Sequence, residues 1–193
     1  MSHISEDILR FWLDETGPQK WYSSDEAFDA LIRDRFLELW RDARDGKLAD
    51  WAGHPRKALA LIILLDQFPR NMFRGDARAF ATDQRAKSVA CSALKHGWDM
   101  RFDEPARQFF YMPFMHSESL TDQDHSVRLM CQKMEEGREG SLLHARVHRE
   151  IIRKYGRFPY RNDALGRKST SQEKSFLTDG GYAKILNEMQ KAA

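Results

Sequence analysis

The chain has 193 residues, with 31 lysines and arginines against 29 aspartates and glutamates, and 41% of its residues are apolar. This composition excludes collagen-like, disordered and disulfide-rich proteins, and it predicts one soluble globular domain over residues 1–193. A chain of this length buries about 70% of the surface that it exposes when unfolded, so it needs no structural metal, and we predict no metal site.

The sequence also predicts where the protein resides. Its longest apolar run, residues 58–65, is far shorter than the roughly 20 residues that cross a bilayer. The first ten residues lack the basic region of a signal peptide. We therefore expect a cytoplasmic protein that contacts no membrane.

The nearly balanced charge is unevenly distributed along the chain. Residues 1–50 carry five more acidic than basic groups, whereas residues 138–174 carry six more basic than acidic groups. Such a basic segment can form a face that binds an anion. Its arginines alternate with glycine, phenylalanine and proline and do not line one continuous helix, so we expect no nucleic acid partner.

The two cysteines lie in separate helical patterns. Cys91 and Cys131 are 40 residues apart and form no CxxC motif. We expect two buried, reduced thiols and neither a redox pair nor a zinc finger. The sequence identifies no cofactor and leaves the oligomeric state open.

Apolar residues recur at helical spacing along most of the chain, and no run alternates for long enough to form a strand. Ser23 and Glu26 have the spacing of a capping box, Pro55 suits a first helical turn, and Asp76 can cap a long helix that ends near Gly97. The predicted helices follow Ser5, Ser23, His54, Asp76 and Asp103, cover 119–134 and 142–155, and resume after Thr170 and Gly181. Short connections predict antiparallel helical hairpins in an all-α bundle or superhelix.

Two segments repeat the order Phe-Pro, then Arg-Asn. We call residues 66–75, DQFPRNMFRG, the first motif and residues 156–167, GRFPYRNDALGR, the second motif. In each motif, proline can end a helix while the arginine and asparagine bind the carbonyls left free at the helix end. The alternative interpretation is a shared pocket in which arginines bind a carboxylate or phosphate in bidentate geometry.

A third unusual segment, FFYMPFMHSE at residues 109–118, ends an aromatic helix at Pro113. His116 has the chemistry of a general base, Glu118 can orient it, and Ser117 is the candidate nucleophile. The alternative is ordinary capping at a helix start, with the histidine as a hydrogen-bonded core residue.

His144 and His148 have the i, i+4 spacing of a zincin motif, but Ala145 stands where that motif requires glutamate. A metalloprotease is therefore not predicted. The apolar residues after His148 direct this histidine toward the core, where it can join His116 in a polar pocket. The alternative is again a buried, satisfied histidine.

Together, the segments 65–75, 79–83, 109–119 and 148–177 make the chain resemble the bacterial "domain of unknown function 924" family from about residue 8 to 177. The resemblance implies a tetratricopeptide-like all-α superhelix in a family without an established activity. Its pattern extends over Asp66, Gln67, Arg70, Asn71, Arg74, Asp83, His116, Ser117, Glu118, Gln123, His148, Arg157, Arg161, Asn162, Arg167 and Ser169. Tyr160 departs from it, because the family typically has histidine there, which argues against an obligatory base at this position.

Two functional hypotheses follow. In the first, a polar pocket binds a small anionic ligand, and whether the protein is also an enzyme stays open. Its catalytic candidates are His116, Glu118 and His148, and its ligand-binding candidates are Gln67, Arg70, Asn71, Arg74, Ser117, Arg157, Tyr160, Arg161, Asn162 and Arg167. In the second, a tetratricopeptide-like scaffold binds a protein or peptide segment, and the motifs are internal caps.

Overall fold

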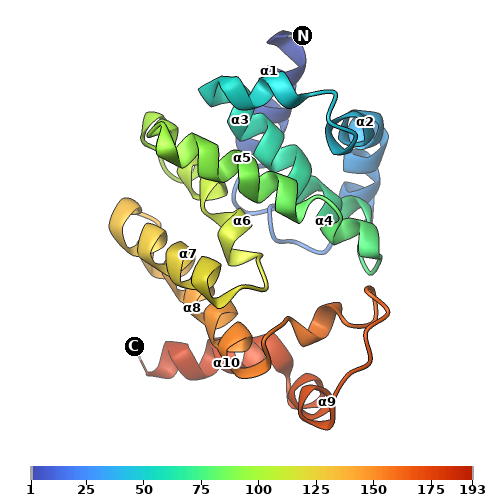
Figure 1. Cartoon of the computed structure of the whole chain (residues 1–193), viewed down its shortest axis with the longest axis vertical. Helices are drawn as coiled ribbons and strands as arrows, with labels where there is room; N and C mark the ends of the chain where they lie inside the picture. The colour runs from blue at the N-terminus through green and yellow to red at the C-terminus, as the bar shows by residue number, and fades with distance from the viewer. Residues whose placement is uncertain (1, 193) are drawn as a thin grey trace. The chain divides into compact units, whose positions relative to one another are not determined.

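The computed structural model describes residues 2–192 and contains no strand within that range (Figure 1). The prediction of an all-α protein is therefore confirmed, while the superhelical arrangement stays a prediction. The chain folds into two compact units, residues 1–113 and 114–193. That these units form one domain also stays a prediction. None of the helices in the described range is long and apolar enough to cross a membrane.

The first unit is built around a buried helix. Its elements are α1 (Ser2–Leu9), η1 (Arg10–Thr16), α2 (Glu26–Arg44), η2 (Ala49–Gly53), α3 (Pro55–Ile62), η3 (Ile63–Gln67), α4 (Phe68–Met72), η4 (Ala77–Phe80), α5 (Asp83–Lys95), η5 (Trp98–Arg101) and η6 (Ala106–Phe110). Residues 58–65 are apolar on every side, and all are buried because α1 and α5 pack against α3 (Figure 1). As predicted, Pro55 occupies the first turn of α3.

The helix beginning at Pro55 does not end at Pro69, contrary to the sequence-based expectation. It continues through the π-helical turn η3 into α4, and Pro69 lies in the first turn of α4. Proline has no N–H, which deprives a carbonyl one turn earlier of its helical donor. The hydroxyl of Thr82 donates to the Leu65 carbonyl at 2.6 Å, so a side chain from the following segment satisfies this group and the helical path persists.

Four other local predictions for the first unit were wrong. Ser5 lies inside α1, which begins at Ser2, so the first helix does not start after Ser5 as predicted. The N-cap of α2 is Asp25, whose carboxylate accepts from the amides of Ala27 and Phe28, whereas the Ser23 hydroxyl donates to the Lys20 carbonyl. Asp76 caps only the short turn η4, and α5 begins after a separate turn at residues 81–82. The segment before Tyr111 forms a 3-10 turn, η6, and not an α-helix.

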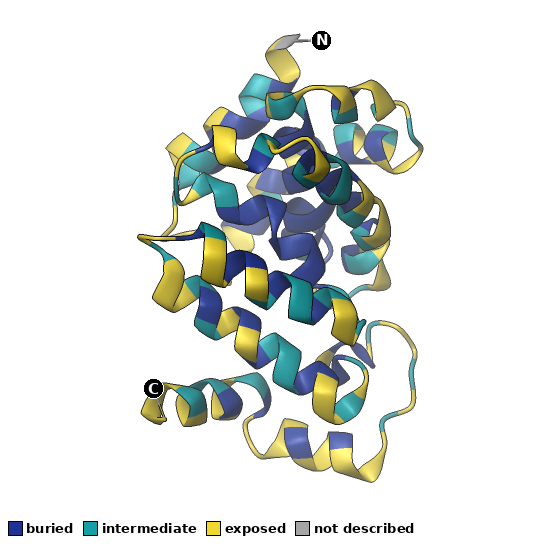
Figure 2. Cartoon of the chain, turned by 60° about the vertical axis from the view of Figure 1, so that its left-hand side comes forward, coloured by how far each residue is buried: buried dark blue, intermediate teal, exposed yellow. Residues whose placement is uncertain are grey.

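The second unit contains two longer helices and two shorter ones. Its elements are α7 (Leu120–Lys133), α8 (Arg138–Tyr155), η7 (Pro159–Arg161), α9 (Ser171–Thr178) and α10 (Gly181–Lys191), while α6 (Met112–Met115) crosses the boundary between the units. Helices α7 and α8 pack along each other, and α10 packs against α8. The apolar faces of α8, α9 and α10 enclose a core around Phe158, while exposed residues occupy their outer faces (Figure 2).

The ends of the second unit's helices agree with their capping residues. Ser119 precedes α7, and Thr170 forms a capping box with Glu173 at α9, as the sequence predicted around these positions. Gly156 ends α8 in the left-handed region, with φ 68°, which other residues adopt only with strain. Helix α8 begins at Arg138, four residues before its predicted start.

Both cysteines are free thiols, but only part of the cysteine prediction holds. Cys91 is half-buried and Cys131 is exposed, because it lies on the solvent face of α7. The expectation that both are buried was wrong. Within residues 2–192, no group of three histidine, cysteine, aspartate or glutamate side chains is placed to hold a metal ion.

Candidate functional site

The first motif lies in the first unit, and its arginines are held by carboxylates. Arg70 donates from Nη1 and Nη2 to the two oxygens of Asp83 at 3.0 and 3.1 Å, and its Nη1 also donates to the Asp66 carbonyl. The side chain of Asp66 is fully buried, and the Gln67 amide donates to it. Arg70 therefore stabilises the junction of η3 and α4, because the Asp66 carbonyl that it binds belongs to η3.

Asp29 of α2 accepts hydrogen bonds from two further polar residues of the first motif, Asn71 and Arg74. Its Oδ1 accepts from Asn71 at 2.8 Å and from Arg74 Nη2 at 2.9 Å, and its Oδ2 accepts from Arg74 Nε at 2.8 Å. Burial raises the pKa of Asp29, but the bonds from Arg74 and Asn71 and the charge of Arg33 outweigh burial and leave the pKa below its ordinary value. This carboxylate is thus ionised at neutral pH and fixes the end of α4 against α2.

A pocket of about 650 Å³ lies beside this ion pair in the first unit. We call it the α2 pocket. Its polar lining includes Glu26, Asp29 and Arg33 on one face of α2, and Arg74, Asp76 and Arg78 from the opposite wall. Its volume falls in the range of small-molecule sites.

The second motif lies in the second unit, and Glu118 is its central carboxylate. Glu118 accepts from Arg167 Nη1 at 2.6 Å, from Arg167 Nη2 at 3.0 Å and from the Phe158 amide at 2.8 Å. Burial raises the pKa of Glu118, but the hydrogen bonds from Arg167 and Phe158 outweigh burial and lower the pKa below its ordinary value. Glu118 therefore acts as an anion that anchors the turn after α8, which makes it a poor proton donor at neutral pH.

Two further contacts complete this turn. Arg167 donates from Nε to Asn162 Oδ1 at 2.9 Å, and Asn162 donates to the Ser169 hydroxyl at 3.0 Å. Arg157 binds both oxygens of Glu173, at 2.6 and 2.8 Å. The hydrogen bond from Arg157 is the main cause that lowers the pKa of Glu173 to about 2. Arg157, Asn162 and Arg167 thus belong to one network of ion pairs and hydrogen bonds that shapes residues 156–173.

Three predicted site residues of the second unit, His116, His148 and Arg161, lie in a group of rings. We call this group the histidine cluster and define it as His116, His144, His148, Phe158, Arg161 and Tyr182. The ring centroids of His116 and His148 are 6.1 Å apart, and Phe158 lies 5.5 Å from His148. Arg161, which is 5% exposed, holds its guanidinium 4.4 Å above the Phe158 ring. The structure therefore brings together two catalytic candidates and one arginine of the second motif.

His148 is a neutral imidazole in this cluster. Its Nδ1 lies 2.8 Å from the His144 carbonyl one turn earlier, so Nδ1 carries the proton and Nε2 keeps its lone pair. Burial is the main cause that lowers the pKa of His148 to about 3, and electrostatic interaction with His116 and Arg161 contributes to the same shift. At neutral pH, His148 therefore accepts hydrogen bonds through Nε2.

Ser117 and Tyr160 lie at the edge of the cluster. The Ser117 hydroxyl donates to the Asp122 carboxylate of α7 at 2.6 Å, which does not suit a nucleophile activated by a histidine base. The amide of Gln123 donates to the carbonyls of Met115 and Ser117, which holds the segment that carries His116. Tyr160 is 41% exposed and stacks on Phe158 with ring centroids 5.3 Å apart.

Two acidic partners of the arginines, Asp29 and Glu173, were not predicted. They do not stand out in the sequence, because each lies in an ordinary helical pattern, and Asp29 is 45 residues from Arg74. Tyr182 was not predicted either; its ring lies 5.1 Å from His148 and stacks on His144. A tyrosine directly after Gly181 at a helix start is the only hint that the sequence offers for this contact.

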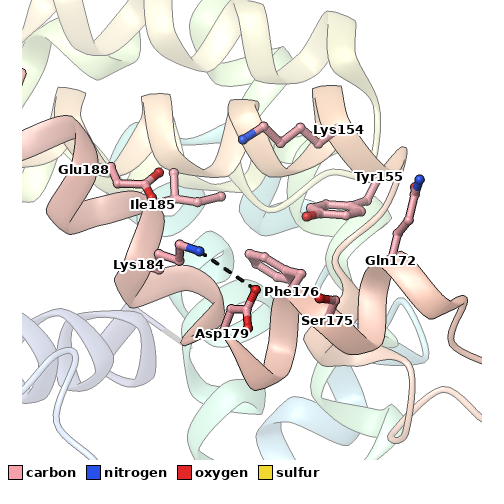
Figure 3. Close-up of a pocket in the computed structure, with 9 residues that line it drawn as sticks. All are labelled: Lys154, Tyr155, Gln172, Ser175, Phe176, Asp179, Lys184, Ile185 and Glu188. Carbon is pink, nitrogen blue, oxygen red and sulfur yellow. Dashed lines mark ion pairs between the residues drawn. The ribbon is translucent and has the colours of Figure 1, made fainter.

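Another pocket, of about 460 Å³, lies among α8, α9 and α10 and is lined by none of the predicted site residues (Figure 3). Tyr155, Phe176 and Ile185 form its apolar floor, and Lys184 and Asp179 form an ion pair of 3.9 Å at its rim (Figure 3). The floor belongs to the core of the second unit.

Comparisons with known proteins agree with the architecture. The family model for bacterial protein of unknown function (DUF924) matches residues 8–181. The solved structure of ATU0120, a protein of unknown function from Agrobacterium tumefaciens, is 39% identical in sequence with a TM-score of 0.86, over 93% of this chain and 99% of that chain. No curated protein sequence matches the chain. The chain belongs to the DUF924 family of bacterial proteins of unknown function.

Proposed function

We propose that the second unit binds a small anionic ligand, a carboxylate or a phosphate, at the histidine cluster. The observation that carries this proposal is that His148 and Arg161 both contact the Phe158 ring and that His116 lies against His148. The positive charge of the neighbouring groups opposes protonation of His148, and the same positive field favours an anion. Arginine and histidine are side chains that bind such anions through charge-assisted hydrogen bonds.

Binding at this site is coupled to a proton. Without ligand, His148 stays neutral down to a pH of about 3. An anion beside it favours the charged imidazolium and so raises its pKa. The ligand therefore binds more tightly as the pH falls toward the raised pKa of His148 in the complex, because binding is then accompanied by proton uptake.

The cluster supports binding more strongly than acid–base catalysis. A general base is most effective when its pKa lies near the working pH, and a pKa of about 3 makes His148 a weak base. The low pKa of Glu118 likewise removes it as a proton donor. His116 is the remaining candidate for proton transfer, on a ligand bound by Arg161.

The test is a titration with inorganic phosphate and with succinate, followed by NMR of the histidine ring signals. The His116 and His148 signals of the wild-type protein should shift with saturation, while His54 and His96 of the first unit should not. Arg161→Gln should weaken binding at least tenfold, and its control Arg146→Gln, an exposed arginine of α8, should change it less than twofold. His148→Asn is a second variant, in which affinity should increase less at low pH than it does in the wild-type protein. Histidine signals that stay unchanged in the folded wild-type protein at saturating anion would overturn the proposal.

A second candidate function, binding of a protein or peptide segment, is favoured by a different observation. Arg70, Arg74, Arg157 and Arg167 are each bound to both oxygens of a carboxylate, which suits structural arginines. On this hypothesis, Arg74→Gln and Arg167→Gln lower the unfolding temperature and leave anion binding unchanged. An anion affinity that falls with Arg167→Gln at unchanged stability would contradict the structural role.

A further inference from the structure

The α2 pocket of the first unit is lined by two ion pairs and by two further charged side chains that belong to neither pair. Arg74 binds both oxygens of Asp29. Arg78 binds both oxygens of Asp76, at 3.0 and 2.9 Å. Within residues 2–192, by contrast, neither Glu26 nor Arg33, which also line the pocket, forms a direct ion pair, although the charge of Arg33 also acts on Asp29. The net result is one positive and one negative group facing the same space.

Arg33 is held in a fixed orientation. Its Nε and Nη2 both donate to the Met72 carbonyl, at 3.1 and 2.9 Å. A guanidinium has five N–H donors, so binding one carbonyl leaves donors for a bidentate partner. Because the side chain is already ordered by α4, a carboxylate ligand would not have to bear the cost of ordering it.

The two charges are separated along α2. Glu26 and Arg33 are seven residues apart, which places their Cα atoms two helical turns, or about 10 Å, from each other. Ala30 and Leu37 of α2 and Met72 and Phe73 of the opposite wall line the same pocket with apolar atoms. The pocket thus presents a cation and an anion at separated points on a partly apolar wall.

We propose that the α2 pocket binds a zwitterionic small molecule, with the ligand's carboxylate on Arg33 and its ammonium group on Glu26. An amino acid with a carbon chain between its charged groups, or a short peptide, has this chemistry. A simple anion would satisfy Arg33 but would be repelled by Glu26. This site is independent of the anion site proposed for the second unit.

The test is calorimetric titration of the whole protein with glycine, γ-aminobutyrate and ε-aminocaproate, a series in which only the distance between the charges grows. Affinity should increase along the series and reach the millimolar range for ε-aminocaproate. Caproate and hexylamine, which keep one charge each, should bind at least tenfold more weakly. Caproate that binds as tightly as ε-aminocaproate would overturn the proposal, because the pocket would then be a plain anion site.

Matched variants on α2 locate the binding. Glu26→Gln and Arg33→Gln should each weaken ε-aminocaproate binding at least tenfold. Glu38→Gln and Arg41→Gln are the controls, because this exposed pair lies on the same helix outside the pocket, and they should change binding less than twofold. Arg33 also supports the end of α4, so Glu26→Gln, which breaks no hydrogen bond, decides the outcome if Arg33→Gln does not fold. Unchanged binding in Glu26→Gln, or no binding of the series by the folded wild-type protein, would overturn the proposal.

Discussion

The two Phe-Pro motifs have similar sequences and different local structures. In the first motif, Pro69 lies inside a helical path that continues from η3 into α4, because Thr82 satisfies the carbonyl that proline leaves free. In the second motif, Gly156 ends α8 in the left-handed region, and Pro159 opens the short turn η7. The same residues therefore support a continuous helix in one unit, where Thr82 follows the motif, and a helix end in the other, where Gly156 precedes the proline.

The motifs also differ in what surrounds them. In both motifs, the arginines bind carboxylates from other segments. These carboxylates are Asp29 and Asp83 in the first unit and Glu118 and Glu173 in the second. Within residues 2–192, only the second motif has a ring in contact with a histidine ring. The ion pairs are thus the shared, structural part of the motif, and the histidine cluster is the part that distinguishes the second unit as the proposed anion site.

The largest expected effect concerns the phenylalanine that precedes the proline in each motif. Phe68 and Phe158 are both fully buried, so replacing either with alanine removes a large apolar side chain from a core. We expect each substitution to lower the free energy of unfolding by about 3–5 kcal/mol, measured by urea denaturation. The control is Leu31→Ala, an exposed leucine of α2, which should cost far less. A loss of less than 1 kcal/mol for either phenylalanine, on the order of a surface change, would show that its motif is not an anchor of its unit.

The same variants test whether residues 1–193 form one domain. All five tryptophans lie in residues 1–113, so tryptophan fluorescence follows the first unit, whereas circular dichroism follows the helices of both. In one cooperative domain, Phe158→Ala shifts both transitions equally. A fluorescence transition that stays at its wild-type midpoint would contradict the single-domain prediction.

The next effect concerns the two central carboxylates. Asp29→Asn and Glu118→Gln each leave an arginine without its anionic partner, and we expect losses of about 1–3 kcal/mol in unfolding free energy. Asp29→Asn should lower the unfolding free energy more than Glu118→Gln does, because the side chain of Asp29 is 10% exposed and that of Glu118 is 27% exposed. Asp34→Asn, an exposed aspartate of α2, is the matched control. The reverse order of the two losses would mean that burial does not set the strength of these pairs.

A smaller effect concerns how the unfolding free energy depends on pH, to which His148 of the second unit contributes. The pKa of His148 is lowered to about 3 from 6.5, so as the pH falls through 6.5 the unfolded chain binds a proton before the folded chain does. Stability is therefore lost between pH 6.5 and 3, by about 1–2 kcal/mol at pH 5 after allowance for solvent screening. Asp29 and Glu118 also have lowered pKa values, but their contribution is lost only as the pH falls below about 4.5.

His148→Asn isolates this contribution. The difference in unfolding free energy between the wild-type protein and the variant should change between pH 7 and pH 5, and the wild-type protein should be the one that loses stability. His54→Asn, in the first unit, controls for removal of a histidine as such. A difference that is constant over this range would show that His148 is not held neutral in the folded protein.

The sequence predicted the helices better than the contacts between them. The all-α class, the start of α3 at Pro55 and the start of a helix after Thr170 follow from local patterns, and the structure has all three. The carboxylate partners of the arginines could not be predicted, because pairs such as Asp29–Arg74 depend on how α2 packs against α4. The persistence of the helix at Pro69 also depends on a distant residue, Thr82.

The smallest expected effect concerns Tyr160, an exposed aromatic residue of the second motif, where the resemblance to the family implies histidine. Its ring is 41% exposed and stacks on Phe158, while Arg161 lies over the same phenylalanine. Histidine is also a flat ring that can stack there, so Tyr160→His should change the unfolding free energy by less than about 0.5 kcal/mol. Because the proposed anion site uses His116, His148 and Arg161, phosphate affinity at pH 7 should change less than threefold. A tenfold tighter binding in this variant would make position 160 part of the anion site, and the histidine cluster would then have to be extended by that residue.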